Sequence, residues 1–159
     1  MPVTVVQERA IPRSIDALDV LGRDYADLFV ATTAAATSAP AEAWARVAIE
    51  QAPAAGRFLA WQVLCALRLD AGRPAAEHVA GWTVTGRDEH WIRLDAGSWF
   101  MRANMIFLIE RDRVSFATLV RYEHPAGRAI WGGAVSAIHR RVAPSFLGGA
   151  VARMRMARS

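Results

Sequence analysis

The 159 residues fit a single domain, and a chain of this length can bury a core without disulfides or structural metals. Hydrophobic residues make up 53% and charged residues 21% of the chain, which excludes an intrinsically disordered protein. The formal net charge is +4, but lysine is absent and all 19 basic residues are arginine. Together with the abundant alanine, this indicates codon bias in a GC-rich genome. We therefore expect a solvated surface and no nucleic-acid partner.

The only cysteine is Cys65, which excludes an intramolecular disulfide. It lies in the apolar run 58–67, where a buried and inert thiol is predicted. The first nine residues lack the basic start and apolar stretch of a signal peptide. The run 58–67 is shorter than the roughly 20 apolar residues that a membrane-spanning helix needs. We expect a cytoplasmic protein.

The first half of the chain predicts an irregular N-terminal segment over residues 1–23, with a short helix after Ser14, and a first strand over 27–33. Pro40 marks the start of a helix, because proline is tolerated in the first helical turn. A second helix is predicted from about residue 57 to residue 69. It is apolar nearly all round, so it should be largely buried.

The middle of the chain has the alternation and polar turns of an antiparallel meander. The predicted strands are 82–85, 90–94, 98–109 and 114–123. In the last of these, one face consists of Val114, Phe116, Thr118, Val120 and Tyr122. Arg121 and Glu123 share the other face, where we expect a surface ion pair of little energetic value.

A long amphipathic helix is predicted to begin near Arg128, with a kink at Pro144. A stripe about 80° wide should face the sheet. It consists of Trp131, Val135, Ile138, Val142 and Phe146. Because a one-layer sheet needs a cover, the order of elements predicts an α+β fold in which an antiparallel sheet wraps around this helix, with two helices inserted after the first strand. We expect one domain over 1–159, with a core over 24–157 and a mobile end.

Five short stretches resemble uncharacterised helix-grip proteins from GC-rich actinobacteria, in the SRPBCC superfamily of START lipid-transfer domains, the birch-pollen allergen and polyketide cyclases. The stretches are Asp24–Asp27, Pro40–Ala45, Val79–Trp82, Val120–Glu123 and Ile138–Pro144. The resemblance implies a helix-grip fold with a cavity between the sheet and the last helix. It carries over no catalytic residue.

Aromatic and methionine side chains would make such a cavity apolar, although core packing explains the tryptophans equally well. The candidate ligand-binding residues are Trp82, Trp91, Trp99, Met101, Arg102, Asn104, Tyr122, Trp131, Ile138 and His139. Arg102 and Asn104 share one face of their strand, and Trp99 and Met101 share the other. The pattern leaves open which face points inward. If Arg102 and Asn104 are inside, each needs a polar partner.

His139 lies at the edge of the apolar stripe and is a weak candidate for a catalytic acid or base. The alternative is a histidine hydrogen-bonded to the sheet, since no carboxylate stands at a fixed spacing from it. A cyclase or dehydratase would have to bring His139 to one pocket with Arg102 or Tyr122. The four histidines fit no metal-ligand pattern, and no glycine-rich phosphate motif is present. We expect no metal and no cofactor.

Three functional hypotheses follow. The first is non-catalytic binding or transport of an apolar small molecule, lipid- or polyketide-like, and the second is the cyclase or dehydratase. The third is an interaction module, because no acidic residue follows Glu123. Its basic end would meet a membrane or protein partner through Arg140, Arg141, Arg153 and Arg155. Cations also simply suit the C-terminal end of a helix. A monomer and a homodimer both stay open.

Overall fold

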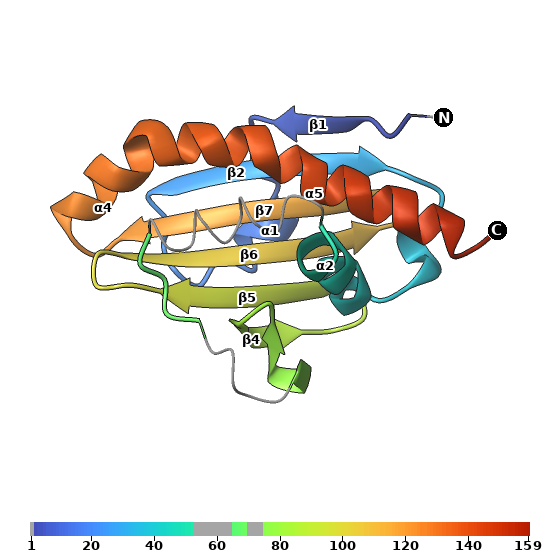
Figure 1. The fold of residues 1–159 in the computed structure, drawn as a ribbon, viewed down its shortest axis with the longest axis horizontal. Helices are drawn as coiled ribbons and strands as arrows, with labels where there is room; N and C mark the ends of the chain where they lie inside the picture. The colour runs from blue at the N-terminus through green and yellow to red at the C-terminus, as the bar shows by residue number, and fades with distance from the viewer. Residues whose placement is uncertain (1, 53–64, 70–74) are drawn as a thin grey trace.

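The computed structural model describes residues 2–52, 65–69 and 75–159 (Figure 1). The described strands form one seven-stranded antiparallel sheet in the order β1-β2-β7-β6-β5-β4-β3. They are β1 Val5–Glu8, β2 Tyr25–Thr32, β3 His78–Val79, β4 Trp82–Arg87, β5 Trp91–Gly97, β6 Met101–Glu110 and β7 Arg113–Tyr122. The helices are α1 Arg13–Asp16, α2 Ala41–Glu50, α4 Pro125–Ile130 and α5 Ser136–Met156, with short turns η1 Ala36–Ser38 and η2 Ala75–Glu77 and a π-helical turn η3 Trp131–Val135. The predicted α+β class and meander are confirmed.

Helices cover both faces of the sheet. Figure 1 shows α5 and α2 lying across one face, which we call the helix face, and α1 behind the other, the outer face. On the helix face, cross-strand pairing lines up Phe29, Phe116 and Phe107 from three neighbouring strands. The rings of Phe107 and Phe116 stack with centroids 4.7 Å apart. The main core therefore lies between the sheet and its two front helices.

The outer face packs against the N-terminal segment, where Ile15 and Leu21 are buried against Leu28 and Ile106. The sequence predicted an irregular segment over residues 1–23 with a short helix after Ser14, and the structure has a short helix, α1, at Arg13–Asp16. Val5–Glu8 pairs with β2 as an edge strand, and α1 follows it. Only this strand was missed, because an edge strand draws its stability from main-chain pairing, which leaves little hydrophobic alternation in four residues.

The helical section after β2 agrees with the prediction in its first half. α2 starts directly after Pro40 and buries Trp44 and Ala48. Of the second predicted helix, residues 57–64 lie outside the described residues. Residues 65 and 66 form a turn and 67–69 have no regular secondary structure, and the Arg68 amide donates to the Gly97 carbonyl at the end of β5 (2.9 Å). Cys65 is buried, and burial raises the pKa of its thiol to about 12.

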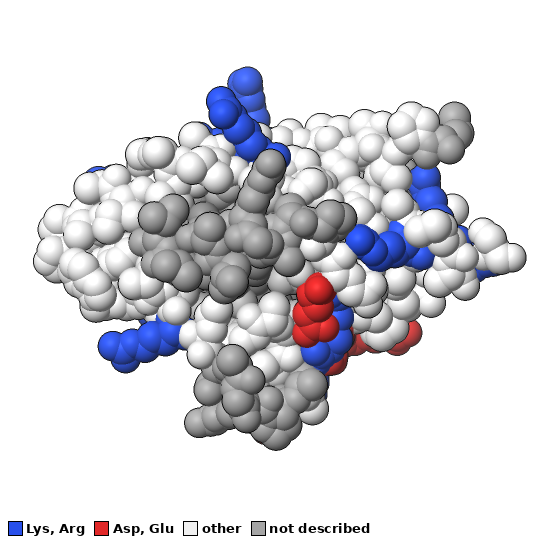
Figure 2. Space-filling view, in the orientation of Figure 1, with Lys and Arg blue, Asp and Glu red and all other residues white. Residues whose placement is uncertain are grey.

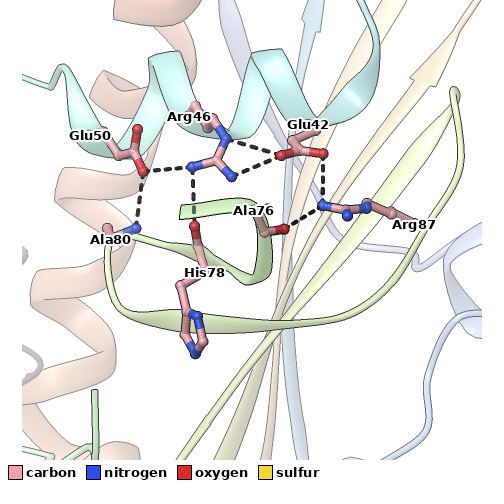
Figure 3. A network of polar contacts seen from close by, with 7 residues as sticks. All are labelled: Glu42, Arg46, Glu50, Ala76, His78, Ala80 and Arg87. Carbon is pink, nitrogen blue, oxygen red and sulfur yellow. Dashed lines mark hydrogen bonds and ion pairs between the residues drawn. The ribbon is translucent and has the colours of Figure 1, made fainter. Parts of the chain in front are cut away.

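A network of ion pairs and hydrogen bonds, which we call the charged clamp, connects α2 to the β3–β4 edge of the sheet (Figure 3). The Arg46 guanidinium bridges Glu42 (2.8 Å) and Glu50 (3.1 Å) and donates to the His78 carbonyl (3.1 Å). Arg87 of β4 reaches the same Glu42 (3.0 Å). Each exposed pair contributes little alone. Because the four side chains share partners, the clamp fixes the orientation of α2 over the sheet.

The C-terminal helical element begins at Pro125, three residues before the predicted start, because the His124 side chain caps it by accepting from the Ala126 amide (3.1 Å). The kink expected at Pro144 stays a prediction, and the marked departure from helical geometry lies earlier in the element. α5 continues without a break through Pro144, and the backbone leaves helical dihedral angles at Gly133 (φ −90°, ψ −127°) inside the π-turn η3. Pro144 lacks an amide that the helix would use, but the turn before it closes without that hydrogen bond.

The π-turn corrects the predicted inward stripe. A π-turn holds one more residue than an α-turn, so the helix after it is rotated by roughly 100° relative to an uninterrupted one. Beyond η3, the C-terminal neighbours of the predicted stripe residues are buried, while Val142 and Phe146 of the stripe still contact the core. The buried residues include Ser136, His139, Ala143 and Leu147. Ile138, predicted to lie inside, has 46% of its surface exposed. Trp131, Val135 and Phe146 are buried as predicted.

Candidate functional site

A polar cluster lies between the helix face and α5. Asp27 of β2 and Thr118 of β7 are direct cross-strand neighbours on the helix face. The rotated α5 places His139 on top of this pair, with Nε2 3.0 Å from Thr118 Oγ1 and 3.3 Å from Asp27 Oδ2. All three residues are buried. His139 is therefore hydrogen-bonded to the sheet, and its carboxylate neighbour comes from a strand more than 100 residues earlier in the chain.

Two further side chains connect this site to the protein surface. The Tyr25 hydroxyl donates to Asp27 Oδ2 (2.8 Å), and the exposed Arg140 guanidinium donates to the Tyr25 hydroxyl oxygen (3.1 Å). Burial, followed by the Asp27 carboxylate, raises the pKa of Tyr25 well above its ordinary value, so its proton stays on at neutral pH. We call Tyr25, Asp27, Thr118, His139 and Arg140 the inner cluster.

One carboxylate oxygen of the inner cluster makes no hydrogen bond to the described residues. Asp27 Oδ1 is buried and has no hydrogen-bond partner among the residues that the structure describes. A buried acceptor left unsatisfied costs about 1–3 kcal/mol, and more for a charged group. This oxygen can accept a hydrogen bond from a hydroxyl or an amine.

Several of the predicted ligand-binding residues also lie on the helix face. Trp82, Met101 and Trp131 are fully buried there. The Trp131 ring contacts His139 (5.4 Å) and meets Tyr25 edge-on (5.3 Å). Tyr122 is partly buried against the same core, under the Arg128 guanidinium. The surroundings of the inner cluster are therefore aromatic and apolar.

The other predicted residues lie elsewhere. Arg102 and Asn104 are on the outer face, where both donate to Asp95 Oδ2 at 2.9 Å. Trp91 packs on the outer face beneath Arg93. Trp99 is 61% exposed, and Ile138 faces outward on α5. Pleat alternation puts Trp99 on the Met101 face, but Trp99 precedes the first paired residue of β6, so the pleat does not reach it.

The residues required for the cyclase or dehydratase hypothesis are not brought together. Arg102 is on the opposite face of the sheet from His139. Tyr122 shares the helix face but stands four residues along β7 from Thr118, roughly 13 Å away at the usual strand rise. Within the described ranges, no group of three or more His, Cys, Asp or Glu side chains could hold a metal ion.

The described residues also line three hollows at the rim of the fold. Two adjoining hollows of about 770 Å³ and 510 Å³ lie where the first residues meet β2 and the last turn of α5. A third, of about 460 Å³, lies beside the exposed Trp99. None of the helices in the described part of the chain is long and apolar enough to cross a membrane.

The sequence matches no protein-family model and no curated protein. A solved structure that resembles it is PA94, a protein of unknown function from Pseudomonas aeruginosa. The identity is 16%, the match covers 85% of this chain and 77% of the other, and the TM-score is 0.24. At that TM-score the likeness carries no argument about fold or function.

Sequence reasoning found His139 and Trp131 but missed Asp27, Thr118 and Tyr25 as their partners. A signal was present in each strand, because Asp27 opens the apolar run of β2 and Thr118 interrupts the apolar face of β7. Only the register that pairs the two strands shows that these polar residues are neighbours.

Proposed function

We propose that this chain is a helix-grip protein that binds an apolar small molecule, lipid- or polyketide-like, between the helix face and α5. A hydroxyl or amine of that molecule would donate to Asp27 Oδ1. The observation that carries the proposal is this buried carboxylate oxygen, which has no partner among the described residues. The kinship with the actinobacterial group and the cytoplasmic location belong to the same proposal.

The surroundings of Asp27 favour a ligand with a mostly apolar body. Phe29 and Tyr25 flank Asp27 along β2, and Phe116 and Val120 flank Thr118 along β7. Each methylene that a ligand buries against such a surface contributes about 0.8 kcal/mol, whereas one hydrogen bond to a charged group adds about 1.5–3 kcal/mol. Apolar contact would therefore supply most of the affinity, and Asp27 would fix the orientation.

Binding is favoured over the cyclase or dehydratase alternative by the composition of the inner cluster. An acid–base reaction needs its groups around one reacting atom, within hydrogen-bond reach of it. Arg102 is on the other face of the sheet and Tyr122 is roughly 13 Å from Thr118 along β7. That leaves His139, which contacts both Asp27 and Thr118. Recognition of one donor group needs only the free oxygen of Asp27.

The test compares a probe that carries a hydroxyl with one that lacks it. The affinities of 1-naphthol and naphthalene are measured by fluorescence titration, and a native ligand is sought by organic extraction and mass spectrometry. We expect 1-naphthol to bind about 10- to 100-fold more tightly, the range that one charged hydrogen bond provides. Asp27→Leu should abolish this preference while naphthalene binding remains.

Asp95→Asn is the matched control, because Asp95 is the corresponding carboxylate on the outer face. It should leave the preference for 1-naphthol unchanged. Circular dichroism spectra would establish that each variant is folded. Equal affinity for the two probes in the unaltered protein, or a preference that survives Asp27→Leu, would overturn the role of Asp27. The absence of both saturable binding and an extracted molecule would overturn the whole proposal.

A further inference from the structure

The last turn of α5 carries a second feature, remote from the inner cluster. It forms one wall of the hollow of about 770 Å³. The lining residues are Pro2, Thr4, Thr33, Ala34, Ala35, Arg155 and Arg158. Among the described residues of this lining, the two arginines are the only charged ones, and none carries a side-chain carboxylate. Figure 2 shows basic side chains beside this end of the helix.

Both guanidinium groups are held in place without being neutralised. Arg155 Nε donates to Thr33 Oγ1 (3.4 Å), and Arg158 Nη1 donates to the Ala34 carbonyl (3.2 Å). Each contact uses one of the five N–H donors of a guanidinium. Neither side chain forms an ion pair with a residue in the described part of the chain. Two positive charges from the C-terminal end of α5 and the residues after it therefore line one hollow.

The adjoining hollow of about 510 Å³ shares Arg155 and adds an apolar surface. Its other charged residues, Glu8 and Arg113, neutralise each other at 2.7 Å. Val6, which is 54% exposed, and Val30 lie beside them. The two hollows together present a paired cationic end and an apolar shelf.

We propose that these hollows bind a phosphomonoester carried on a small apolar body, with the phosphate between Arg155 and Arg158 and the apolar part along Val6 and Val30. Arginine forks match phosphate oxygens in bidentate geometry, and two of them suit the double negative charge of a monoester. Such a group occurs on soluble phosphate esters and on the headgroup of phosphatidic acid. This site and the proposed Asp27 site share no residue, so the failure of one proposal would leave the other untouched.

The experiment measures binding of butyl phosphate, inorganic phosphate and butanol by calorimetry, and flotation with phosphatidic acid vesicles against phosphatidylcholine vesicles. We expect butyl phosphate to bind more tightly than either of its parts, and more weakly as salt rises. The double variant Arg155→Gln/Arg158→Gln should weaken binding at least 10-fold. Val6→Ser should reduce the advantage of butyl phosphate over inorganic phosphate.

Arg141→Gln is the matched control, because Arg141 is an exposed arginine of the same helix outside both hollows. It should bind as the unaltered protein does. Saturable binding of butyl phosphate that depends on Arg155 and Arg158 would support a soluble ester. Association with phosphatidic acid vesicles alone, with the same dependence, would support the lipid headgroup. The proposal is overturned if neither probe binds, or if Arg141→Gln weakens binding as much as the double variant.

Discussion

Each face of the sheet carries a group of polar side chains around one carboxylate, Asp95 on the outer face and Asp27 on the helix face. The two carboxylates have different kinds of partner. On the outer face, Asp95 accepts hydrogen bonds from Arg102 and Asn104, and its partly accessible side chain touches a permanent cation directly. On the helix face, Asp27 is sealed from solvent, and the permanent cation Arg140 reaches only the Tyr25 hydroxyl. The outer carboxylate contacts a permanent cation, whereas the inner one contacts the His139 imidazole and the Tyr25 hydroxyl.

Each of the two polar groups also contains one buried oxygen that has no hydrogen-bond partner among the described residues. Asn104 Oδ1 also lacks a partner among the described residues, but a neutral amide oxygen costs less to bury than a carboxylate oxygen. The outer group is thus an ordinary surface ion pair beside a buried amide. The inner cluster keeps an acidic side chain inside the core, and such groups gather at functional sites as well as in structural ion-pair networks. This difference makes the helix face the better candidate for function.

The two faces should differ most in how much apolar packing they contribute. Phe116→Ala removes the middle ring of the row on the helix face, and we expect the free energy of unfolding to fall by about 3–5 kcal/mol. Leu119→Ala opens the smaller outer core from the same strand and should cost less, about 2–3 kcal/mol. Urea denaturation measures both. A larger loss for Leu119→Ala would show that the outer face holds the main core.

The attachment of the C-terminal element to the helix face depends on a close approach at Gly127. A Cβ atom there would collide with the Phe100 carbonyl oxygen, which belongs to the backbone and cannot move aside. We expect Gly127→Ala to lower the free energy of unfolding by about 1–3 kcal/mol. Gly148→Ala is the control, because its Cβ would meet only the Val5 side chain, at an ordinary contact distance of 3.6 Å. Equal effects of the two variants in urea denaturation would contradict this role for Gly127.

The inner cluster and the Asp95 group should also differ in how much one polar side chain contributes to the free energy of unfolding. We expect this difference to be smaller than the one between the two apolar cores. Thr118→Val removes the hydroxyl that contacts His139 in the core, and we expect a loss of about 1–2 kcal/mol in the free energy of unfolding. Arg102→Gln breaks an exposed ion pair, which should change it by less than about 1 kcal/mol. Denaturation at low and high salt tests this, since only the exposed pair is screened. A salt-sensitive effect of Thr118→Val would argue against a sealed inner cluster.

The contrast between the faces also explains what the sequence could predict. Alternation in β7 and the turns between strands predicted the meander, because those signals are local. The pleat also separated Arg102 and Asn104 from Met101 correctly. Which of the two faces lies under α5 depends on distant packing, and both faces of β6 are apolar in part. The local pattern therefore could not assign the inside.

The inner cluster was beyond local reasoning for two physical reasons. Its carboxylate comes from β2, and only the β2–β7 register makes Asp27 a neighbour of Thr118. Its histidine points inward only because the π-turn at 131–135 shifts the helical phase by one residue. A uniform 100° periodicity places Ile138 inside and His139 at the edge. The pair Gly132-Gly133 was visible in the sequence, and weak helix formers in mid-helix are the signal that such a turn needs.

Ionisation of Tyr25 gives the most selective test of the inner cluster. The chain has only two tyrosines, so a tyrosine titration contains only two contributions to separate. Burial raises the pKa of Tyr25, with a further increase from the Asp27 carboxylate, and burial raises that of Tyr122 as well. Tyr25→Phe leaves Tyr122 alone, so a difference spectrum at 295 nm isolates Tyr25. We expect no Tyr25 ionisation at pH 10, where a free tyrosine is half ionised. Asp27→Asn should move its titration to lower pH, because it removes the negative charge.

The same shift predicts how stability changes at alkaline pH. A phenol whose pKa is higher in the folded state than in the unfolded state binds more protons when folded, so its contribution is fully present below about pH 10 and is lost as the pH rises toward the folded pKa. Tyr25→Phe should therefore flatten the fall in the free energy of unfolding above pH 10. On the outer face, Asp95→Asn should leave both the titration and this slope unchanged, since Asp95 does not contact Tyr25. If Asp95→Asn moved the Tyr25 titration as far as Asp27→Asn, the two faces would be electrostatically coupled, and the inner cluster would not be the isolated site that its geometry indicates.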